Sequence, residues 1–377
     1  MTLNPKYTLV HDDSSLKQLL YHLQFYDIAA VDTEADPMYH YEIKLCLIQI
    51  TIGETHWLVD TLAGLDLSPI FTSKAMKHII LHGADYDLRL LWKNFKYSPV
   101  SVFDTMLAAK FLGEKKLGLA DLVYKYFQEV LEKDKQKSDW TLRPLPAEMC
   151  RYAMNDTVFL HELCALLGEQ LLQKNRFHWL KEMGAYLLQV TQIPSPEKKE
   201  PWRIIGSHRL SAKSLNLLKH LWYWREKEAK KLDRPSYKVL APGFMLNLVK
   251  RITPHQDFDP SILPKLPKNF TGKRLESFYN TLRTAFSVKK ESYPSPYKHP
   301  PPPELLPEVK LLDQLKTIRN QKAESLQIDP SIIANRPQLI ALATRPPFSW
   351  EERFSQAHLM NFQIDLWQKI LNENELL

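Results

Sequence analysis

Four carboxylates and one phenol in the first half of the chain have the types and spacing needed for metal-dependent chemistry. Asp32 and Glu34 stand two residues apart at the end of a β-rich run, IAAVDT, so both side chains point to one face of a predicted strand. Adjacent acids repel each other unless a cation holds them, and the pair therefore suits a hard divalent metal. Taken alone, the same pair also fits an exposed polar strand end.

Two further segments add candidates. Asp87 lies in HGADYDLRLL on the first turn of a predicted helix, where an acid also suits the positive end of the helix. We assign that capping role to Asp85, which leaves Asp87 for the metal. Tyr152 and Asp156 are four residues apart in RYAMNDTVFL and share a helical face. A phenol in that place can hold a water against a metal bound by the carboxylate, or it can simply make a surface hydrogen bond.

The elements that position these residues carry alternating strand and helix signals. Strands are predicted for IAAVDT, LCLIQITI, HWLVD and MKHIILH. Helices are predicted for HDDSSLKQLLYHLQ, DYDLRLLWKNF, FDTMLAAKFL, LADLVYKYFQEVL and PAEMCRYAMNDTVFLHELCALLGEQLL. Strands first and helices mostly afterwards favour an α/β domain with a mixed sheet flanked by helices.

The rest of the chain is predicted to form two small all-α domains. At 377 residues the chain is too long for one hydrophobic core. Proline with charge in IPSPEKKEPW predicts a linker, and YPSPYKHPPPPELLPE predicts a second, extended joint. We therefore expect domains at 1–175, 205–290 and 303–377.

The basic charge is concentrated in the middle of the chain. Residues 201–300 carry a net charge of +13, whereas residues 1–200 carry −4 and residues 301–377 carry −2. Such a segment suits a polyanion such as nucleic acid, although a solvated basic surface has the same composition. Neither a signal peptide nor a membrane-length apolar run is present, so we expect a cytoplasmic protein with no membrane contact. The three cysteines are expected to be reduced structural thiols.

The motifs VDTE, HGADYDLRLL and YAMND, in this order, resemble the three exonuclease motifs of the DEDD superfamily in its tyrosine-bearing branch. The runs LCLIQI, VFDTMLAAKFL and KSDWTLRPLP extend the resemblance, over about the first 175 residues, to the ribonuclease D family. The segment from WRIIGSHRL to SYKVL is similar to the helicase-and-RNase-D C-terminal (HRDC) module, and residues 305–370 resemble a weaker second copy.

The resemblance implies a ribonuclease H-like fold and a 3′-5′ exoribonuclease that releases nucleoside monophosphates, with tRNA precursors as substrates and no obligate protein partner. It makes Asp32, Glu34 and Asp156 ligands of one metal, with Asp32 bridging to a second metal on the side of Asp87. It also makes Tyr152 the residue that orients the attacking water. An all-oxygen ligand set favours Mg²⁺ or Mn²⁺ over zinc.

Contacts to RNA are expected at two places. Trp140 and Arg143, in KSDWTLRPLP, could meet a base and a phosphate near the substrate entrance, or the loop could pack on its own tryptophan. Five basic residues of the middle segment are expected to contact phosphates of the RNA backbone: Arg225, Lys227, Lys230, Lys231 and Arg234. Trp222 and Trp224 stand at helical spacing among leucines, which favours core packing for at least one of them.

Two other functions remain open from the sequence. One is a DNA-directed 3′-5′ exonuclease of the same superfamily, because the 2′-hydroxyl contacts that separate RNA from DNA cannot be located. The other is a catalytically silent nucleic-acid-binding scaffold, which would not need every acid and the tyrosine. P-loop hydrolases and dinucleotide-dependent enzymes are excluded because their glycine motifs are missing from a chain with ten glycines.

Overall fold

The computed structural model describes residues 6–132, 135–194, 196, 198–296, 307–344 and 349–376. The chain divides into two compact units. The first comprises Met1–Ala35, Leu45–Pro194 and Pro303–Leu377, and the second comprises Asp36–Lys44 and Ser195–Pro302. The extended joint predicted over 293–308 lies largely outside the described residues.

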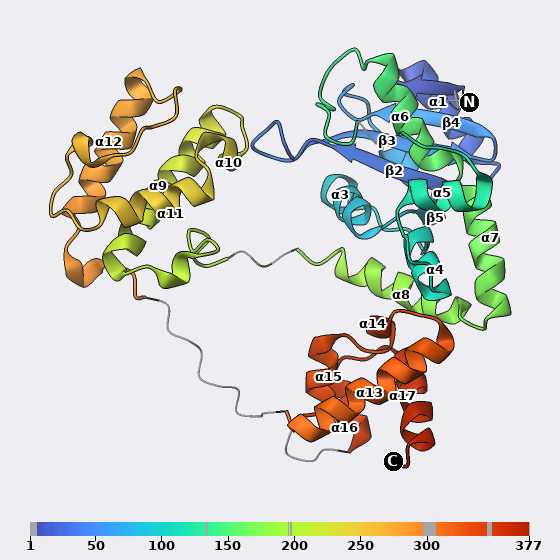
Figure 1. The fold of residues 1–377 in the computed structure, drawn as a ribbon. Helices are drawn as coiled ribbons and strands as arrows, with labels where there is room; N and C mark the ends of the chain where they lie inside the picture. Colours follow the sequence, from blue (N-terminus) through green and yellow to red (C-terminus); the bar gives the residue numbers. More distant parts are fainter. Residues whose placement is uncertain are drawn as a thin grey trace. The chain divides into compact units, whose positions relative to one another are not determined.

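A six-stranded mixed sheet forms the centre of the first unit (Figure 1). In spatial order its strands are β1 (Tyr7–Val10), β4 (Thr55–Asp60), β3 (Leu45–Ile52), β2 (Ala29–Ala35), β5 (His78–Leu81) and β6 (Ser101–Asp104). Strand β3 runs antiparallel to its neighbours β2 and β4, and all other neighbouring pairs are parallel. This arrangement confirms the predicted α/β fold with a mixed sheet.

The sequence does not predict the two edge strands, β1 and β6. Each has only four residues, and neither contains the continuous apolar run IIL that marks the equally short β5. Phe103 and Asp104, which the sequence predicts to begin a helix, instead end β6. The helix α4 starts at the next residue, and the Asp104 carboxylate accepts hydrogen bonds from its first free backbone N–H groups.

Eight helices flank the sheet within the described part of residues 6–194. They are α1 (Asp13–Leu23), α2 (Ser68–Phe71), α3 (Asp85–Phe95), α4 (Thr105–Leu112), α5 (Leu119–Phe127), α6 (Ala147–Val158), α7 (Leu160–Gln173) and α8 (Phe177–Val190), with a 3-10 turn η1 (Ala75–Lys77). The single helix predicted over 146–172 is therefore two helices, which meet at Phe159. Helix α6 packs against β2, β3 and β4, whereas α8 packs against β6.

The last helices of the chain also belong to the first unit. They are α13 (Val309–Leu326), α14 (Pro330–Ile333), α15 (Arg336–Leu342), α16 (Trp350–Gln356) and α17 (Asn361–Glu373). Phe362 of α17 stacks on Trp179 of α8, with ring centroids 5.2 Å apart. The buried guanidinium of Arg176 donates to the carbonyl oxygens of Phe111 (2.8 Å) and Leu326 (2.7 Å). These helices share one hydrophobic core with α4, α7 and α8, so this segment has a packing role.

Backbone contact between α4 and the last helices is close at Gly113. This glycine ends α4 with a φ of 92°, in the left-handed region. A methyl group in its place would collide with the carbonyl oxygen of Gln327. Only glycine fits here, because both the backbone conformation and the space exclude a side chain.

The second unit is helical. Its elements are α9 (Ala212–Lys231), α10 (Ser236–Val239), α11 (Pro242–Ile252) and α12 (Gly272–Ser287), with 3-10 turns η2 (Ser207–Arg209), η3 (Pro260–Ile262) and η4 (Lys290–Ser292). Trp224 is buried in the core of this unit against Phe270 and Phe278, which confirms the core packing predicted for at least one of Trp222 and Trp224. The segment 36–44 is held in the same unit, where the backbone N–H of Tyr41 donates to Asp233 (3.1 Å).

Among the described residues, no helix combines the length and the apolar composition needed to cross a membrane. All three cysteines are free, as expected.

Candidate active site

Three of the predicted acids meet on one face of the sheet. Strand β2 presents Asp32 and Glu34 on the same face because they are two residues apart. Helix α6 crosses β2, β3 and β4 and brings Asp156 to them. One carboxylate oxygen from each of the three lies within 4.8 Å of the other two. Among the described residues, this is the one group of three or more acidic, histidine or cysteine side chains with such spacing.

The fourth acid, Asp87, joins them from α3. The hydroxyl of Thr33, between the two strand acids, donates a hydrogen bond to the Asp87 carboxylate. The charge of Asp87 raises the pKa of Asp32, and it does the same for Glu34 and Asp156. All four acids predicted from the sequence are therefore neighbours.

Electrostatics of the cluster favour a bound cation. Burial, followed by repulsion from the other acids, raises the pKa of Glu34 to about 9 and holds that of Asp32 well above its usual range. The same two causes raise the pKa of Asp156 to about 7. Burial raises the pKa of Asp87 to about 6, against the lowering effect of the hydrogen bond from Thr33. Carboxylates packed this closely fit a hard divalent cation, which would let all of them ionise together.

Tyr152 lies one turn before Asp156 on α6, as the spacing predicts, and its side chain is buried. Its ring centroid is 6.1 Å from that of Trp140. Trp140 is itself completely buried in an apolar cluster with Met149 and Cys46. The indole presents no exposed face to a base, so the structure gives Trp140 a packing role in place of the expected RNA contact.

Arg143 is likewise engaged within the protein. Its Nε and Nη2 donate to the two carboxylate oxygens of Asp60, each at 2.6 Å. Nη1 also donates to the carbonyl oxygen of Trp140, and Nη2 to that of Cys46, both at 2.9 Å. The guanidinium therefore fixes the loop that carries Trp140, which agrees with the packed loop, one of the two alternatives that the sequence leaves open.

The five basic residues expected to contact RNA differ in exposure. Arg225 is only 6% exposed and forms an ion pair with Glu226 at 2.7 Å, so it is not available to a phosphate. The other four are exposed at the end of α9 and in the turn after it: Lys227, Lys230, Lys231 and Arg234.

The capping role assigned to Asp85 is wrong. The residue at the cap position of α3 is Ala84, and the exposed Asp85 pairs with Arg89 at 3.0 Å. Asp104 takes the role expected of Asp85, because its buried carboxylate accepts the backbone N–H groups of Gly83 and Ala84, both at 2.9 Å. The run VFDTM contains this residue, but its contact with α3 depends on the pairing of β5 with β6.

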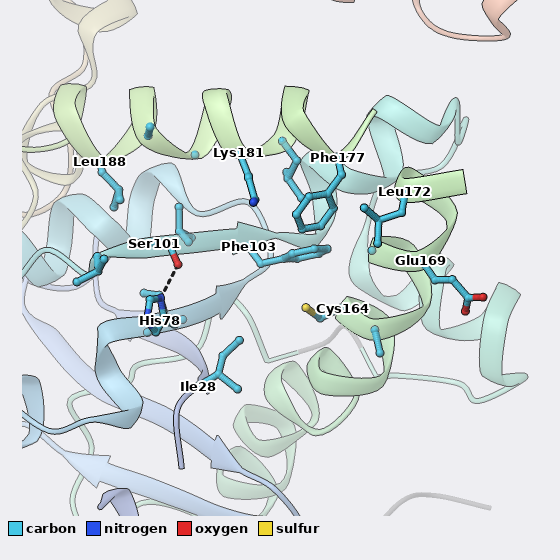
Figure 2. Close-up of a pocket in the computed structure, with 18 residues that line it drawn as sticks. Ile28, His78, Ser101, Phe103, Cys164, Glu169, Leu172, Phe177, Lys181 and Leu188 are labelled. Atoms are coloured by element: carbon cyan, nitrogen blue, oxygen red, sulfur yellow. Dashed lines mark hydrogen bonds between the residues drawn. The ribbon is translucent and has the colours of Figure 1, made fainter. Parts of the chain in front are cut away.

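A separate hollow of about 800 Å³ lies between α7, α8 and strands β5 and β6 (Figure 2). Its lining is mostly apolar and includes the rings of Phe103 and Phe177, with His78 hydrogen-bonded to Ser101 at 2.8 Å. None of the four acids lines it, so the chemistry of the cluster does not extend into this hollow.

Comparisons with known proteins agree with this geometry. Residues 7–172 match a family model described as a 3′-5′ exonuclease. The chain is 28% identical over 342 residues to ribonuclease D of Pseudomonas paraeruginosa, covering 90% of this chain and 89% of the relative. It is 26% identical over 340 residues to ribonuclease D of Bartonella henselae, covering 89% and 83%.

A solved structure of Escherichia coli RNase D has a similar fold, with a TM-score of 0.66 and 22% identity over 98% of this chain and 99% of that chain. The exonuclease match contains all four acids and Tyr152, and the relatives align over both units. The chain is therefore a 3′-5′ exoribonuclease that is similar to ribonuclease D over most of its length.

Proposed function

We propose that the protein hydrolyses RNA from its 3′ end, one nucleotide at a time, with two divalent cations, Mg²⁺ or Mn²⁺, held by the four acids. The observation that carries this proposal is the convergence of Asp32, Glu34 and Asp156 within 4.8 Å, with Asp87 tied to the same strand. When bound, such cations activate a water on one side of a phosphodiester and stabilise the leaving oxygen on the other.

The residues divide this task. Asp32, Glu34 and Asp156 would hold one cation, and Asp32 would bridge to a second cation on the side of Asp87. Tyr152 would orient the attacking water through its hydroxyl, one helical turn from Asp156. The products would be nucleoside 5′-monophosphates.

RNA is proposed as the substrate on two grounds. The relatives aligned over most of the chain are named ribonuclease D. The solved Escherichia coli protein is described as an exoribonuclease involved in structured RNA processing. We further propose precursors of tRNA as the structured RNA. The two helical segments, 205–290 and 303–377, would be HRDC modules.

The first module would supply phosphate contacts through the four exposed basic residues at the end of α9. Because the helices of 303–377 pack into the core of the first unit, the second module is assigned to packing.

The substrate class is tested with purified full-length protein and 5′-labelled RNA and DNA of one sequence, each with Mg²⁺, with Mn²⁺ and with chelator. We expect a metal-dependent ladder that shortens RNA from its 3′ end, together with nucleoside 5′-monophosphates. Faster shortening of DNA than of RNA would favour a DNA-directed exonuclease. Binding of both without any cleavage would favour a silent scaffold.

The phosphate contacts are tested by changing Lys227, Lys230, Lys231 and Arg234 together to alanine in the full-length chain. The salt dependence of affinity for a tRNA-like RNA should weaken by roughly 0.7 in slope for each phosphate that the variant no longer neutralises. A matched control changes four exposed basic residues of the last helices: Lys310, Lys316, Arg336 and Lys369. Equal slopes in the two variants would remove the proposed role of the α9 residues.

A further inference from the structure

The side-chain amide of Gln49 is completely buried and, within the described residues, has no hydrogen-bond partner at either Nε2 or Oε1. Gln49 lies on β3, whose sequence LCLIQITI contains two polar residues. The other, Thr51, is fully satisfied by the hydroxyl of Thr157 on α6 at 2.8 Å and by His56 at 3.0 Å. Leaving an amide buried and unpaired is costly, so the position of Gln49 needs an explanation.

The register of the sheet places Gln49 directly opposite Asp32. Residues opposite each other in an antiparallel pair point to the same face and are close enough for their side chains to interact. The face is the one covered by α6, because Leu47 packs in a cluster with Tyr152 and Thr51 bonds Thr157. The Gln49 amide therefore faces the space beside Asp32 and beneath the part of α6 that carries Asp156.

We propose that Gln49 is a positioning residue for Asp32: Nε2 of Gln49 donates a hydrogen bond to the Asp32 carboxylate when a divalent cation is bound at the acids. This inference rests on the metal site of the proposed function. A hydrogen bond from an amide N–H to a carboxylate that binds a metal is charge-assisted and roughly twice as strong as one between neutral groups. The proposed bond supplies a partner for an amide that is otherwise unpaired.

Two consequences separate this role from simple packing. Replacing the amide by an apolar chain of similar shape should stabilise the metal-free protein, because an unpaired polar group is removed from the core. The same replacement should weaken cation binding, because partners of metal ligands typically contribute tenfold to hundredfold in affinity. A residue that only fills space would change stability without changing cation affinity.

The test compares Gln49→Met with Thr51→Val in the full-length protein. Thr51→Val removes a satisfied hydrogen bond on the same face of the same strand and serves as the matched control. Mn²⁺ affinity is measured by calorimetry, and metal-free stability is measured by urea unfolding. Gln49→Met should bind Mn²⁺ at least about tenfold more weakly and unfold at a higher urea concentration. Thr51→Val should unfold at a lower urea concentration and bind Mn²⁺ like the wild type.

Activity supplies a second readout. Raising the Mn²⁺ concentration should restore cleavage by Gln49→Met but not by Asp32→Asn. If Gln49→Met binds Mn²⁺ like the wild type while Asp32→Asn does not bind, the inference about Gln49 is overturned and the metal site stands. If the wild-type protein does not bind Mn²⁺ at all, both the inference and the proposed function fail. Gln49→Leu repeats the comparison with a second apolar side chain.

Discussion

The hydroxyl of Thr33 donates a hydrogen bond to the carboxylate of Asp87, although 54 residues separate them in the chain. Both side chains are buried. The bond ties the strand that carries two of the acids to the helix that carries the fourth. It also lowers the pKa of Asp87, against the opposing effect of burial.

Thr33→Val should weaken cation binding in a pH-dependent manner. Without the hydrogen bond the pKa of Asp87 rises above its present value of about 6, so protons compete with the cation up to a higher pH. We expect Mn²⁺ affinity to fall roughly threefold to tenfold at about pH 6.5 and the deficit to shrink at about pH 9. Calorimetry at the two pH values checks this, and a deficit independent of pH would contradict it.

Stability of the metal-free protein should decrease as the pH rises. The acids of the cluster have ordinary pKa values of 3.8 and 4.5, but in the folded protein Asp87, Asp156 and Glu34 are raised to about 6, 7 and 9. Between these values the folded protein keeps protons that the unfolded chain has released, and the free energy of unfolding therefore falls with pH. The loss should extend from about pH 4 to about pH 9.

Urea unfolding across this range, with chelator and with saturating Mg²⁺, measures the effect. Mg²⁺ should remove most of the decrease, since it replaces the protons as the positive partner of the acids. Asp32→Asn should flatten the metal-free curve because it removes one repelling charge. A curve with chelator that rises toward pH 9 would contradict the electrostatic description of the cluster.

Tyr152→Phe should reduce the rate of cleavage while preserving the metal site. Loss of the hydroxyl removes the group proposed to orient the attacking water. We expect kcat to fall about a hundredfold as a result. The ring still packs against Trp140, so stability and Mn²⁺ affinity should change little. Single-turnover kinetics on RNA measures the rate. An unchanged rate would remove Tyr152 from the mechanism.

Arg143→Ala should destabilise the fold more than it affects RNA binding. The guanidinium forms a two-bond ion pair with the buried Asp60, and its loss leaves that carboxylate unpaired at a cost of roughly 2–4 kcal/mol. The control is Arg89→Ala, which breaks an exposed pair with Asp85 and should cost roughly 1 kcal/mol or less. Urea unfolding measures the free energy of unfolding of both variants. RNA affinity, measured at a temperature where both variants are folded, tests whether Arg143 contacts a phosphate. A large loss of affinity with unchanged stability would restore the expected RNA role.

Much of the site could be predicted because its residues lie on regular elements. Two-residue spacing on a strand and four-residue spacing on a helix determine which side chains share a face, and this was sufficient for Asp32, Glu34, Tyr152 and Asp156. Contacts between residues far apart in the chain could not be predicted in this way. Neither the bond between Thr33 and Asp87 nor the position of Gln49 opposite Asp32 can be read from local patterns, because both depend on the register of the folded sheet.

Local patterns leave the role of a side chain open, or misplace it, where the folded environment decides what the side chain contacts. Trp140 and Arg143 stand in a polar, proline-rich loop that looks exposed in the sequence, yet the tryptophan is buried and the arginine binds Asp60. Arg225 stands in a basic run, yet it is buried beside Glu226. Helical periodicity continues on both sides of Phe159, so the sequence predicts one long helix. The structure instead has two helices that meet at this residue.

The most direct test of the convergence of the four acids is the cation stoichiometry of the wild type and of Asp32→Asn, measured by Mn²⁺ titration alongside hydrolysis of 3′-labelled RNA. We predict two Mn²⁺ ions in the wild type in the presence of a nonhydrolysable RNA. In Asp32→Asn we predict loss of both sites and a rate at least roughly a thousandfold lower. Full cation binding and normal cleavage by Asp32→Asn would contradict the account.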